Sequence, residues 1–474
     1  MGVSPCKSAP DSLLLTPYSL LLTALAVRLW ASWKTSAYLD EAFMYYVAAQ
    51  GPAGIVTACK GDFILPGFYF PLWPLAAFTA NRFVLRLPSV LAGAALAGVI
   101  VLVGKRLSCE RAGWAAGWLY ALAYPVWMVD AQIRGYGWLD LAGMLALLWW
   151  LEGRRKAQAG VFLVLPWLHV MGAAWVAGWA FYGVLRRDRR LVLAAGLGLA
   201  LFAPWLVYTF SGPTSYFQRQ SRSRPSALDL LTAAGFMTGV PAWVPSVWLI
   251  AGVGCLGLGL VAAGLWRSRE RLLLSVLLVA PLALALVAAL RGTQEFQARY
   301  LVPVAGLAYL LAFQALPGRA VRWACGLVVA VNVATAGVFP FSPRLWNQDW
   351  DGAARWIEAY QRPGDLIAVY TPYSLLALNY AYAGDTCYLQ LNQQGVLDIR
   401  YTDGYRGVDQ TPLVPALLGP ALEGRRVFLV LNQEGPGGRE IREWFAARCE
   451  VERELQLRTL YSWGTIEVFL LRPR

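Results

Sequence analysis

The chain has 474 residues, of which 58% are hydrophobic and only 15% are charged. This composition, with its repeated long uncharged runs, excludes an ordinary soluble protein and predicts a polytopic membrane protein. The formal net charge of +13 does not indicate a nucleic-acid partner, because the basic residues occur as short clusters between the apolar runs. Cytoplasmic loops of membrane proteins carry such clusters, so we attribute the positive charge to the orientation of the chain in the membrane.

The residue types do not indicate soft-metal or disulfide chemistry. The seven cysteines are scattered and the chain has one histidine, so neither a zinc site nor a disulfide framework is predicted. No glycine-rich phosphate loop is present that would indicate a nucleotide. The residue types therefore indicate no particular cofactor, although a divalent metal ion stays open because the neighbouring carboxylates Asp40 and Glu41 can hold one.

The first apolar run extends from Ser12 to Trp33 and is preceded by one basic residue, so we expect a retained membrane helix. Residues 32–86 are expected to form the first external loop. The loop contains an apolar stretch, Phe63 to Phe78, with three prolines. Because proline breaks a regular helix, we expect interfacial or re-entrant backbone there, not a span.

The basic clusters predict the remaining spans, because an even number of passes must separate clusters that all lie in the cytoplasm. Lys156 and Arg186 are too close for two full spans, so we expect two short helices that meet near residues 166–172, with His169 at the outer tip. The rule gives eleven spans and places the C-terminus outside. Other spans are expected between Arg111 and Asp130 and at 87–104, 137–151, 191–210, 243–266, 272–290, 300–316 and 321–339.

From about residue 341 the composition changes, and acidic residues slightly outnumber basic ones. Residues 1–340 are therefore assigned to a transmembrane domain and residues 341–474 to a small extracytoplasmic α/β domain. Its predicted helices are 350–360, 373–383 and 438–448, and its predicted strands are 365–370, 426–431, 455–461 and 465–471.

The adjacent carboxylates Asp40 and Glu41 leave the first apolar helix at its outer end. A carboxylate that is partly desolvated there could act as a general base. Alternatively, Asp40 caps a helix over residues 41–50 and has no chemical role.

A second group, Asp130, Gln132, Arg134 and Tyr136, lies between two apolar runs. An arginine in such a place can bind a phosphate through two hydrogen bonds. Alternatively, Asp130 and Arg134 form a local ion pair at helical spacing, or Asp140 is a buried partner of Arg134.

Arg299 and Tyr300 open a late apolar run, and His169 is the single histidine. A cation at the membrane surface attracts lipid phosphates, and the imidazole can bind a substrate oxygen or phosphate. The alternatives are interfacial anchoring for Arg299 and a hydrogen-bonded core position for His169.

Together these segments resemble the GT-C superfamily of membrane glycosyltransferases, in particular the glycosyltransferase 39-like group that includes protein O-mannosyltransferases and the lipid A aminoarabinose transferase. The resemblance rests on the order and spacing of short motifs. They are Leu39-Asp40-Glu41-Ala42, Arg86-Leu87-Pro88-Ser89, Gly104-Lys105-Arg106-Leu107, Gln132-Ile133-Arg134-Gly135-Tyr136, Leu168-His169, Arg299-Tyr300-Leu301-Val302-Pro303, Asp349-Trp350-Asp351-Gly352 and Pro363-Gly364-Asp365.

The resemblance implies a GT-C fold and a transfer reaction in which a sugar moves from a polyprenyl phosphate to an acceptor hydroxyl with inversion. The acceptor would be a glycan, a lipid or a protein. The catalytic aspartate of the family falls on Asp40, with Glu41 in support. The implied substrate-binding residues are Asp130, Gln132, Arg134, Tyr136, His169, Arg299 and Tyr300.

The resemblance also implies a place in the bacterial plasma membrane, among membrane lipids, with the active site and the C-terminal domain outside. Two motifs depart from the family pattern. Gln132 stands where relatives often have an acid, and Phe63-Ile64-Leu65-Pro66 replaces a His-Pro-Pro element of the first loop.

The main alternative function is a transporter or flippase of lipid-linked glycans, which also places charges near a membrane. Transporters tend to be built from paired halves with a site at the midplane. The odd span count, the absence of a sequence repeat and the location of the charges on one side all favour the transferase.

Overall fold

The computed structural model describes residues 16–62, 65–107, 109–210, 224–238, 240, 244, 246–291, 296–339, 342, 348–370, 374–384, 388–392, 395–398, 424–432, 438–459 and 465–474. The chain divides into two compact units. One contains Met1–Trp33 and Gly51–Val338, and the other contains Lys34–Gln50 and Phe339–Arg474.

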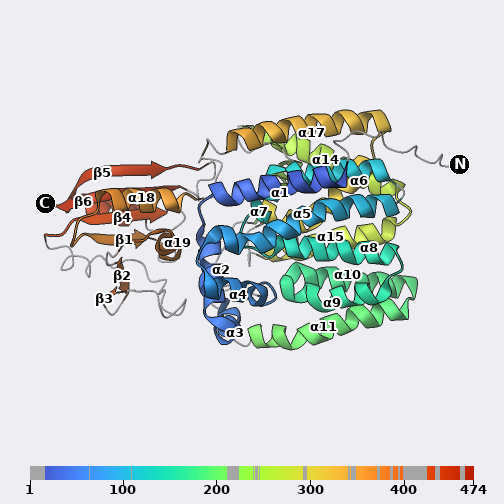
Figure 1. The fold of residues 1–474 in the computed structure, drawn as a ribbon, viewed down its shortest axis with the longest axis horizontal. Helices are drawn as coiled ribbons and strands as arrows, with labels where there is room; N and C mark the ends of the chain where they lie inside the picture. Colours follow the sequence, from blue (N-terminus) through green and yellow to red (C-terminus); the bar gives the residue numbers. More distant parts are fainter. Residues whose placement is uncertain are drawn as a thin grey trace. The chain divides into compact units, whose positions relative to one another are not determined.

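The first unit is helical (Figure 1). Its elements are α1 (Pro17–Lys34, which runs to the unit boundary), α3 (Gly51–Asp62), α4 (Tyr69–Phe78), α5 (Arg82–Arg106), α6 (Glu110–Leu122), α7 (Tyr124–Asp130), α8 (Tyr136–Leu151), α9 (Arg155–Leu168), α10 (Val170–Arg186), α11 (Arg189–Phe210), α13 (Ala227–Met237), α14 (Val247–Arg267), α15 (Arg271–Leu290), the 3-10 helix η2 (Ala298–Leu301), α16 (Val302–Gln314) and α17 (Gly318–Val338).

Five helices of the described chain are long and apolar enough to cross a membrane: α5, α11, α14, α15 and α17. The protein is therefore an integral membrane protein. The count of eleven spans remains a prediction, since several expected spans correspond to helices that are shorter than a bilayer requires.

Two expectations for irregular parts of the helical unit can be compared with the structure. Helices α9 and α10 meet at His169, inside the predicted range 166–172. The proline-rich stretch does form a regular helix, α4, although it has only ten residues and is too short to span. The expectation that proline prevents a regular helix here was thus wrong. Pro66 precedes the helix and Pro71 lies in its first turn, where no amide hydrogen bond is lost, whereas Pro74 lies inside the helix without ending it.

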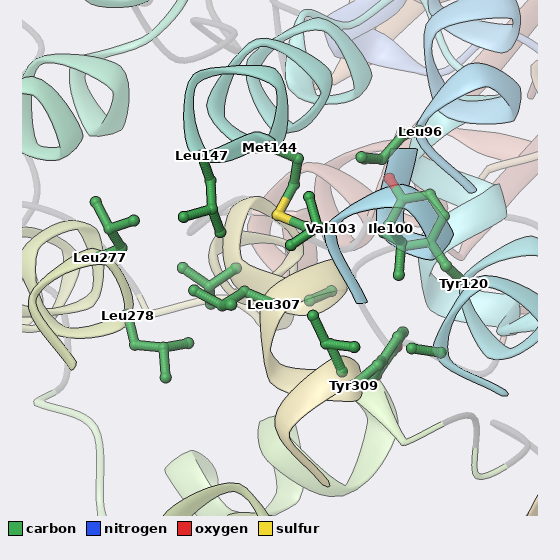
Figure 2. Close-up of a cluster of buried hydrophobic side chains, with 14 of the residues drawn as sticks. Leu96, Ile100, Val103, Tyr120, Met144, Leu147, Leu277, Leu278, Leu307 and Tyr309 are labelled. Carbon is green, nitrogen blue, oxygen red and sulfur yellow. The ribbon is translucent and has the colours of Figure 1, made fainter. Parts of the chain in front are cut away.

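The core of the helical unit lies where α5, α6, α8, α15 and α16 converge. Figure 2 shows aliphatic side chains of these helices with Tyr120 and Tyr309 among them. Helices α5 and α6 approach closely because both have glycine at the crossing. A Cβ on Gly104 would lie 2.5 Å from the Cα of Gly113, so a side chain at either position would push the helices apart.

The second unit is an α/β domain. Its elements are α2 (Leu39–Ala49), α18 (Trp350–Tyr360), β1 (Leu366–Tyr370), α19 (Ser374–Ala381), β2 (Tyr388–Asn392), β3 (Gly395–Asp398), β4 (Val427–Asn432), α21 (Gly438–Ala446), β5 (Cys449–Leu457) and β6 (Ile466–Pro473). The strands form one mixed sheet in the order β3-β2-β1-β4-β6-β5, in which β1 pairs in parallel with both β2 and β4.

The central strands of this sheet are covered on both faces, which explains why they read as continuous apolar runs. Alternate residues point to opposite sides. Ile367 and Phe428 belong to the apolar cluster that includes α18, α19 and α2. Leu366 and Val427 belong to the cluster on the other face, which includes α21.

The sequence prediction of this domain was right for most elements. Helix α18 has the predicted bounds, and α19, α21, β1, β4 and β6 each lie within two residues of the prediction at one end at least. The predicted start of strand β5 was wrong, because the strand begins at Cys449 and not at Leu455. Strands β2 and β3 were not predicted.

Helix α2 belongs to the α/β unit, although more than three hundred residues separate it from most of that unit in the sequence. The predicted external loop, residues 32–86, is consequently divided between the two units. Asp40 and Glu41 lie in the α/β unit, while α3 and α4 lie in the helical one.

Candidate functional site

The loop between α7 and α8 holds Arg134 in a fixed backbone position. Ser32 Oγ at the end of α1 donates a hydrogen bond to the Ala131 carbonyl at 3.2 Å. Ser89 Oγ of α5 donates to the Arg134 carbonyl at 2.6 Å. Two helices thus hold the loop at both ends, and the Arg134 side chain is partly exposed.

His169 occupies the turn between α9 and α10 and caps the second of these helices. Its Nδ1 accepts a hydrogen bond from the Met171 amide at 3.2 Å, as N-cap side chains do. Since a neutral imidazole has one acceptor and one donor nitrogen, Nε2 must carry the proton. The ring of Tyr136 lies beside it, with the centroids 5.2 Å apart.

Arg134 and Arg299 both lie close enough to His169 to affect its ionisation. Burial, together with the positive charges of these two arginines, lowers the pKa of His169 to about 4. The structure therefore brings together three residues that the sequence places in three separate loops. All three side chains carry N–H groups, which are the kind of donor that binds a phosphate.

Arg299 and Tyr300 lie on the 3-10 helix η2, which packs against α7, α13, α15 and α16. Tyr300 is buried, and its ring centroid lies 5.8 Å from the Arg299 guanidinium carbon. The aromatic ring thus supports the arginine through a cation–π contact. Arg299 itself is partly exposed, as a ligand-binding residue must be.

Asp130 does not belong to the group formed by Arg134, His169 and Arg299. It is completely buried and forms an ion pair with Arg28 of α1, with Arg28 Nη2 2.7 Å from Asp130 Oδ2. The other donors of the Arg28 guanidinium bind Asp130 and the carbonyls of Ala24, Tyr120 and Ala121. All five N–H groups are thereby satisfied.

A second carboxylate joins the buried ion pair. Tyr120 Oη lies 3.3 Å from both Asp130 Oδ2 and Asp140 Oδ2. The backbone approaches the pair closely at Gly93, where a Cβ would lie 2.3 Å from Asp130 Oδ2. Glycine is therefore required at that position of α5.

The sequence prediction did not identify Arg28 as the partner of Asp130. The expected alternatives paired Arg134 with Asp130 or Asp140, because both are near it in sequence. Arg28 carried a usable signal, since it is a charged residue inside the first apolar run, where a charge is costly unless paired. Gln132 is also buried, at 7% exposure.

Asp40 and Glu41 lie in the first turn of α2 and have different surroundings. Glu41 is fully buried, and its Oε2 accepts a hydrogen bond from the Tyr38 backbone N–H at 3.3 Å. Asp40 is partly exposed. The expectation that Asp40 caps this helix was wrong, because the helix begins two residues earlier, at Leu39, and Glu41 supplies the carboxylate that binds the N-cap amide.

The part of the chain that the structure describes contains no group of three or more His, Cys, Asp or Glu side chains that could hold a metal ion. Asp40 and Glu41 remain a pair of carboxylates, one of them engaged in capping.

Comparisons with known proteins come from structure alone. No protein-family model matches the sequence, and no curated protein matches it. The structure of ArnT from Cupriavidus metallidurans in the apo state matches with a TM-score of 0.56 at 16% identity, and the alignment covers 95% of this chain and 97% of ArnT. The chain has the GT-C fold.

A second ArnT structure, which contains undecaprenyl phosphate, gives a TM-score of 0.56 at 14% identity and covers 97% of this chain and 98% of ArnT. The oligosaccharyltransferase of Archaeoglobus fulgidus is less similar, with a TM-score of 0.44 at 12% identity, over 77% of this chain and 62% of that one. The similarity to ArnT extends over nearly the full length of the chain.

Proposed function

We propose that this protein is an inverting glycosyltransferase that moves a sugar from a polyprenyl phosphate to an acceptor hydroxyl at the extracytoplasmic face of a membrane. The observation that carries the proposal is the near-complete match to ArnT, whose second structure contains undecaprenyl phosphate. The cationic group around His169 supports it, because this chain has its own donors for a phosphate.

In the proposed reaction, the acceptor oxygen attacks the anomeric carbon of the sugar while the bond from that carbon to the phosphate oxygen breaks. Asp40 accepts the proton of the acceptor hydroxyl, and the polyprenyl phosphate departs with the bonding electrons. Attack from the side opposite the leaving group inverts the anomeric configuration. Glu41 cannot serve equally well, since it is buried and caps α2.

The departing phosphate gains negative charge, which fixed positive donors stabilise. Arg134 and Arg299 would supply guanidinium groups, and His169 would donate through Nε2. The group lies in a membrane protein whose partners are the lipid-linked donor, the surrounding lipids and a glycan, lipid or protein acceptor. We infer that the protein lies in a bacterial plasma membrane, with the active site and the α/β unit outside.

The test compares Asp40→Asn with Asp351→Asn in a transfer assay. Both aspartates are the second residue of an eleven-residue helix and both are partly exposed, so the second variant is a matched control. The probes are synthetic undecaprenyl-phosphate pentoses and hexoses with radiolabelled sugars, added to membranes of the expressing cells. We expect Asp40→Asn to lose about 10²–10⁴-fold in rate, as general bases contribute, and Asp351→Asn to keep wild-type activity.

Wild-type transfer by a folded Asp40→Asn variant would refute the assignment. The transporter alternative makes a different prediction. A flippase would move a fluorescent undecaprenyl-phosphate sugar across vesicles without changing its covalent structure, and the released carrier would never appear by mass spectrometry.

A further inference from the structure

The helix that carries Asp40 is packed into the α/β unit along its length. Ala42 is fully buried within the same apolar cluster as Trp350 of α18. Nearer the other end of α2, Asn379 Nδ2 of α19 donates a hydrogen bond to Tyr46 Oη at 2.8 Å. The rings of Tyr45 and Tyr380 also contact each other in a tilted arrangement, with centroids 5.0 Å apart.

The N-termini of α2 and α18 are capped by each other's preceding segments. The Leu39 amide, the first of α2, donates to Gln348 Oε1 at 3.4 Å, and Gln348 lies just before α18. The Asp351 amide, in the first turn of α18, donates to Ser36 Oγ at 3.0 Å, and Ser36 lies just before α2. First-turn amides have no partner within their own helix, so each segment supplies an acceptor that the other helix lacks.

Gln348 is the more rigid half of this exchange. Its side chain is buried, and Oε1 also accepts a hydrogen bond from the Trp350 indole at 2.7 Å. The indole is itself fully buried, so it fixes the orientation of the Gln348 amide. The residue that receives this support, Leu39, directly precedes Asp40.

We propose that Gln348 is a positioning residue for the transfer reaction. By holding the Leu39 amide, it fixes the first turn of α2 and with it the direction of the Asp40 carboxylate. Ser36 acts in the same way through α18. The inference rests on the proposed function of Asp40, and it assigns to the α/β unit a direct part in catalysis.

The expected effect falls on kcat and not on donor binding. A displacement of about 1 Å can cost about 10²-fold in rate, whereas the residues proposed to bind the phosphate are untouched. We therefore expect Gln348→Leu to lower kcat about 10- to 100-fold with KM for the undecaprenyl-phosphate sugar unchanged. The Ser36→Ala variant should lower kcat about 3-fold, since it acts through a second helix.

Two further variants separate positioning from general stability. Gln348→Glu keeps the acceptor and should restore most of kcat. Its added charge beside Asp40 should also move the acid limb of the kcat–pH profile to higher pH, because a neighbouring negative charge disfavours ionisation of a carboxyl group. Gln361→Leu is the matched control, since Gln361 accepts a hydrogen bond from Tyr382 at the opposite end of α18, and it should keep wild-type kcat.

A wild-type kcat in Gln348→Leu would overturn the inference while leaving the proposed function intact, provided that Asp40→Asn is inactive in the same assay. An equal loss in Gln361→Leu would also overturn it, since the effect would then be one of domain stability. Should Gln348→Leu fail to fold, Ser36→Ala decides, and an unchanged kcat there would count against positioning. Activity in Asp40→Asn refutes the proposed function instead.

Discussion

The helical unit contains two groups of charged residues at or beside apolar runs, one around Arg28 and the other around His169. They differ in what their charges contact. In the buried group, all five N–H donors of Arg28 bind protein acceptors, one of which is Asp130. In the group around His169, the two arginines are partly exposed, and their charges lower the pKa of the imidazole to about 4. The hydrogen bonds of Arg28 thus stabilise the fold, whereas the second group places two arginines near one imidazole.

This contrast helps to decide whether a charged residue in a membrane protein has a functional or a structural role. An intramembrane charge is a functional candidate by default, but a cation whose donors are all bound by the protein has none left for a ligand. Cations that lie near one another repel, and a bound anion would relieve that repulsion. Two partly exposed arginines near one imidazole are thus the stronger indication of a binding site.

The largest effect is expected from breaking the buried group. The Asp130→Asn substitution leaves the Arg28 charge buried without a counterion, which costs about 3–5 kcal/mol of unfolding free energy. Denaturant titration of the purified protein in detergent micelles would measure this loss. Asp140→Asn is the control, because Asp140 contacts Tyr120 and not Arg28, and it should cost much less. Equal losses in the two variants would show that the ion pair has no special weight.

An intermediate effect is expected from removing one cation of the second group. Arg134→Ala and Arg299→Ala should each weaken undecaprenyl phosphate binding about 10- to 100-fold, since a charge-assisted hydrogen bond contributes about 1.5–3 kcal/mol. Native mass spectrometry with added undecaprenyl phosphate gives the measurement. Arg291→Ala removes an exposed charge at the end of α15 and should bind normally. Unchanged binding in both test variants would show that the phosphate binds elsewhere.

The smallest effect concerns the pH dependence of stability through His169. Its pKa is about 4 in the folded protein against an ordinary 6.5, so the unfolded chain binds more protons between these values. The stability that His169 contributes is therefore present above pH 6.5 and is lost as the pH falls toward 4, by about 1 kcal/mol at pH 5.5. Compared with His169→Gln, the wild type should lose more stability on acidification to pH 5.5.

The single histidine also allows a direct measurement. Carbon-13 labelling of histidine gives one imidazole signal, because the chain has one such residue. Its titration should show a pKa near 4 without ligand and a higher value with undecaprenyl phosphate, since an anion favours the protonated ring. A titration near pH 6.5 in the free protein would contradict the proximity of the two arginines.

The sequence predicted well wherever local pattern decides the structure. The hairpin at His169 followed from the spacing of basic clusters, and α18 was predicted with the bounds that the structure shows. Helix α4 was missed because a rule based on composition ignores position: Pro66 precedes the helix, Pro71 lies in its first turn, and the helix continues past Pro74. Strand β3 and its partner β2 were missed because their few residues carry little pattern.

Contacts between residues that are far apart in the sequence could not be predicted. Nothing in the spacing of residues indicates that Arg28 meets Asp130, since the choice among arginines depends on how α1 packs beside α6 and α7. Likewise, Glu41 and not Asp40 binds the N-cap amide because α2 begins two residues before the expected start. The placement of Asp40 as catalytic base is still a prediction.

The discontinuous α/β unit has a consequence for synthesis of the protein. Helix α2 is made first, then all of Gly51–Val338 must be made and inserted before α18 and the sheet exist. At usual translation rates this takes roughly tens of seconds. During that time Ala42 and its neighbours on α2 have none of the apolar cluster that finally covers them. The proposed catalytic helix is thus among the first segments made, yet its native contacts form only after the rest of the chain has been made.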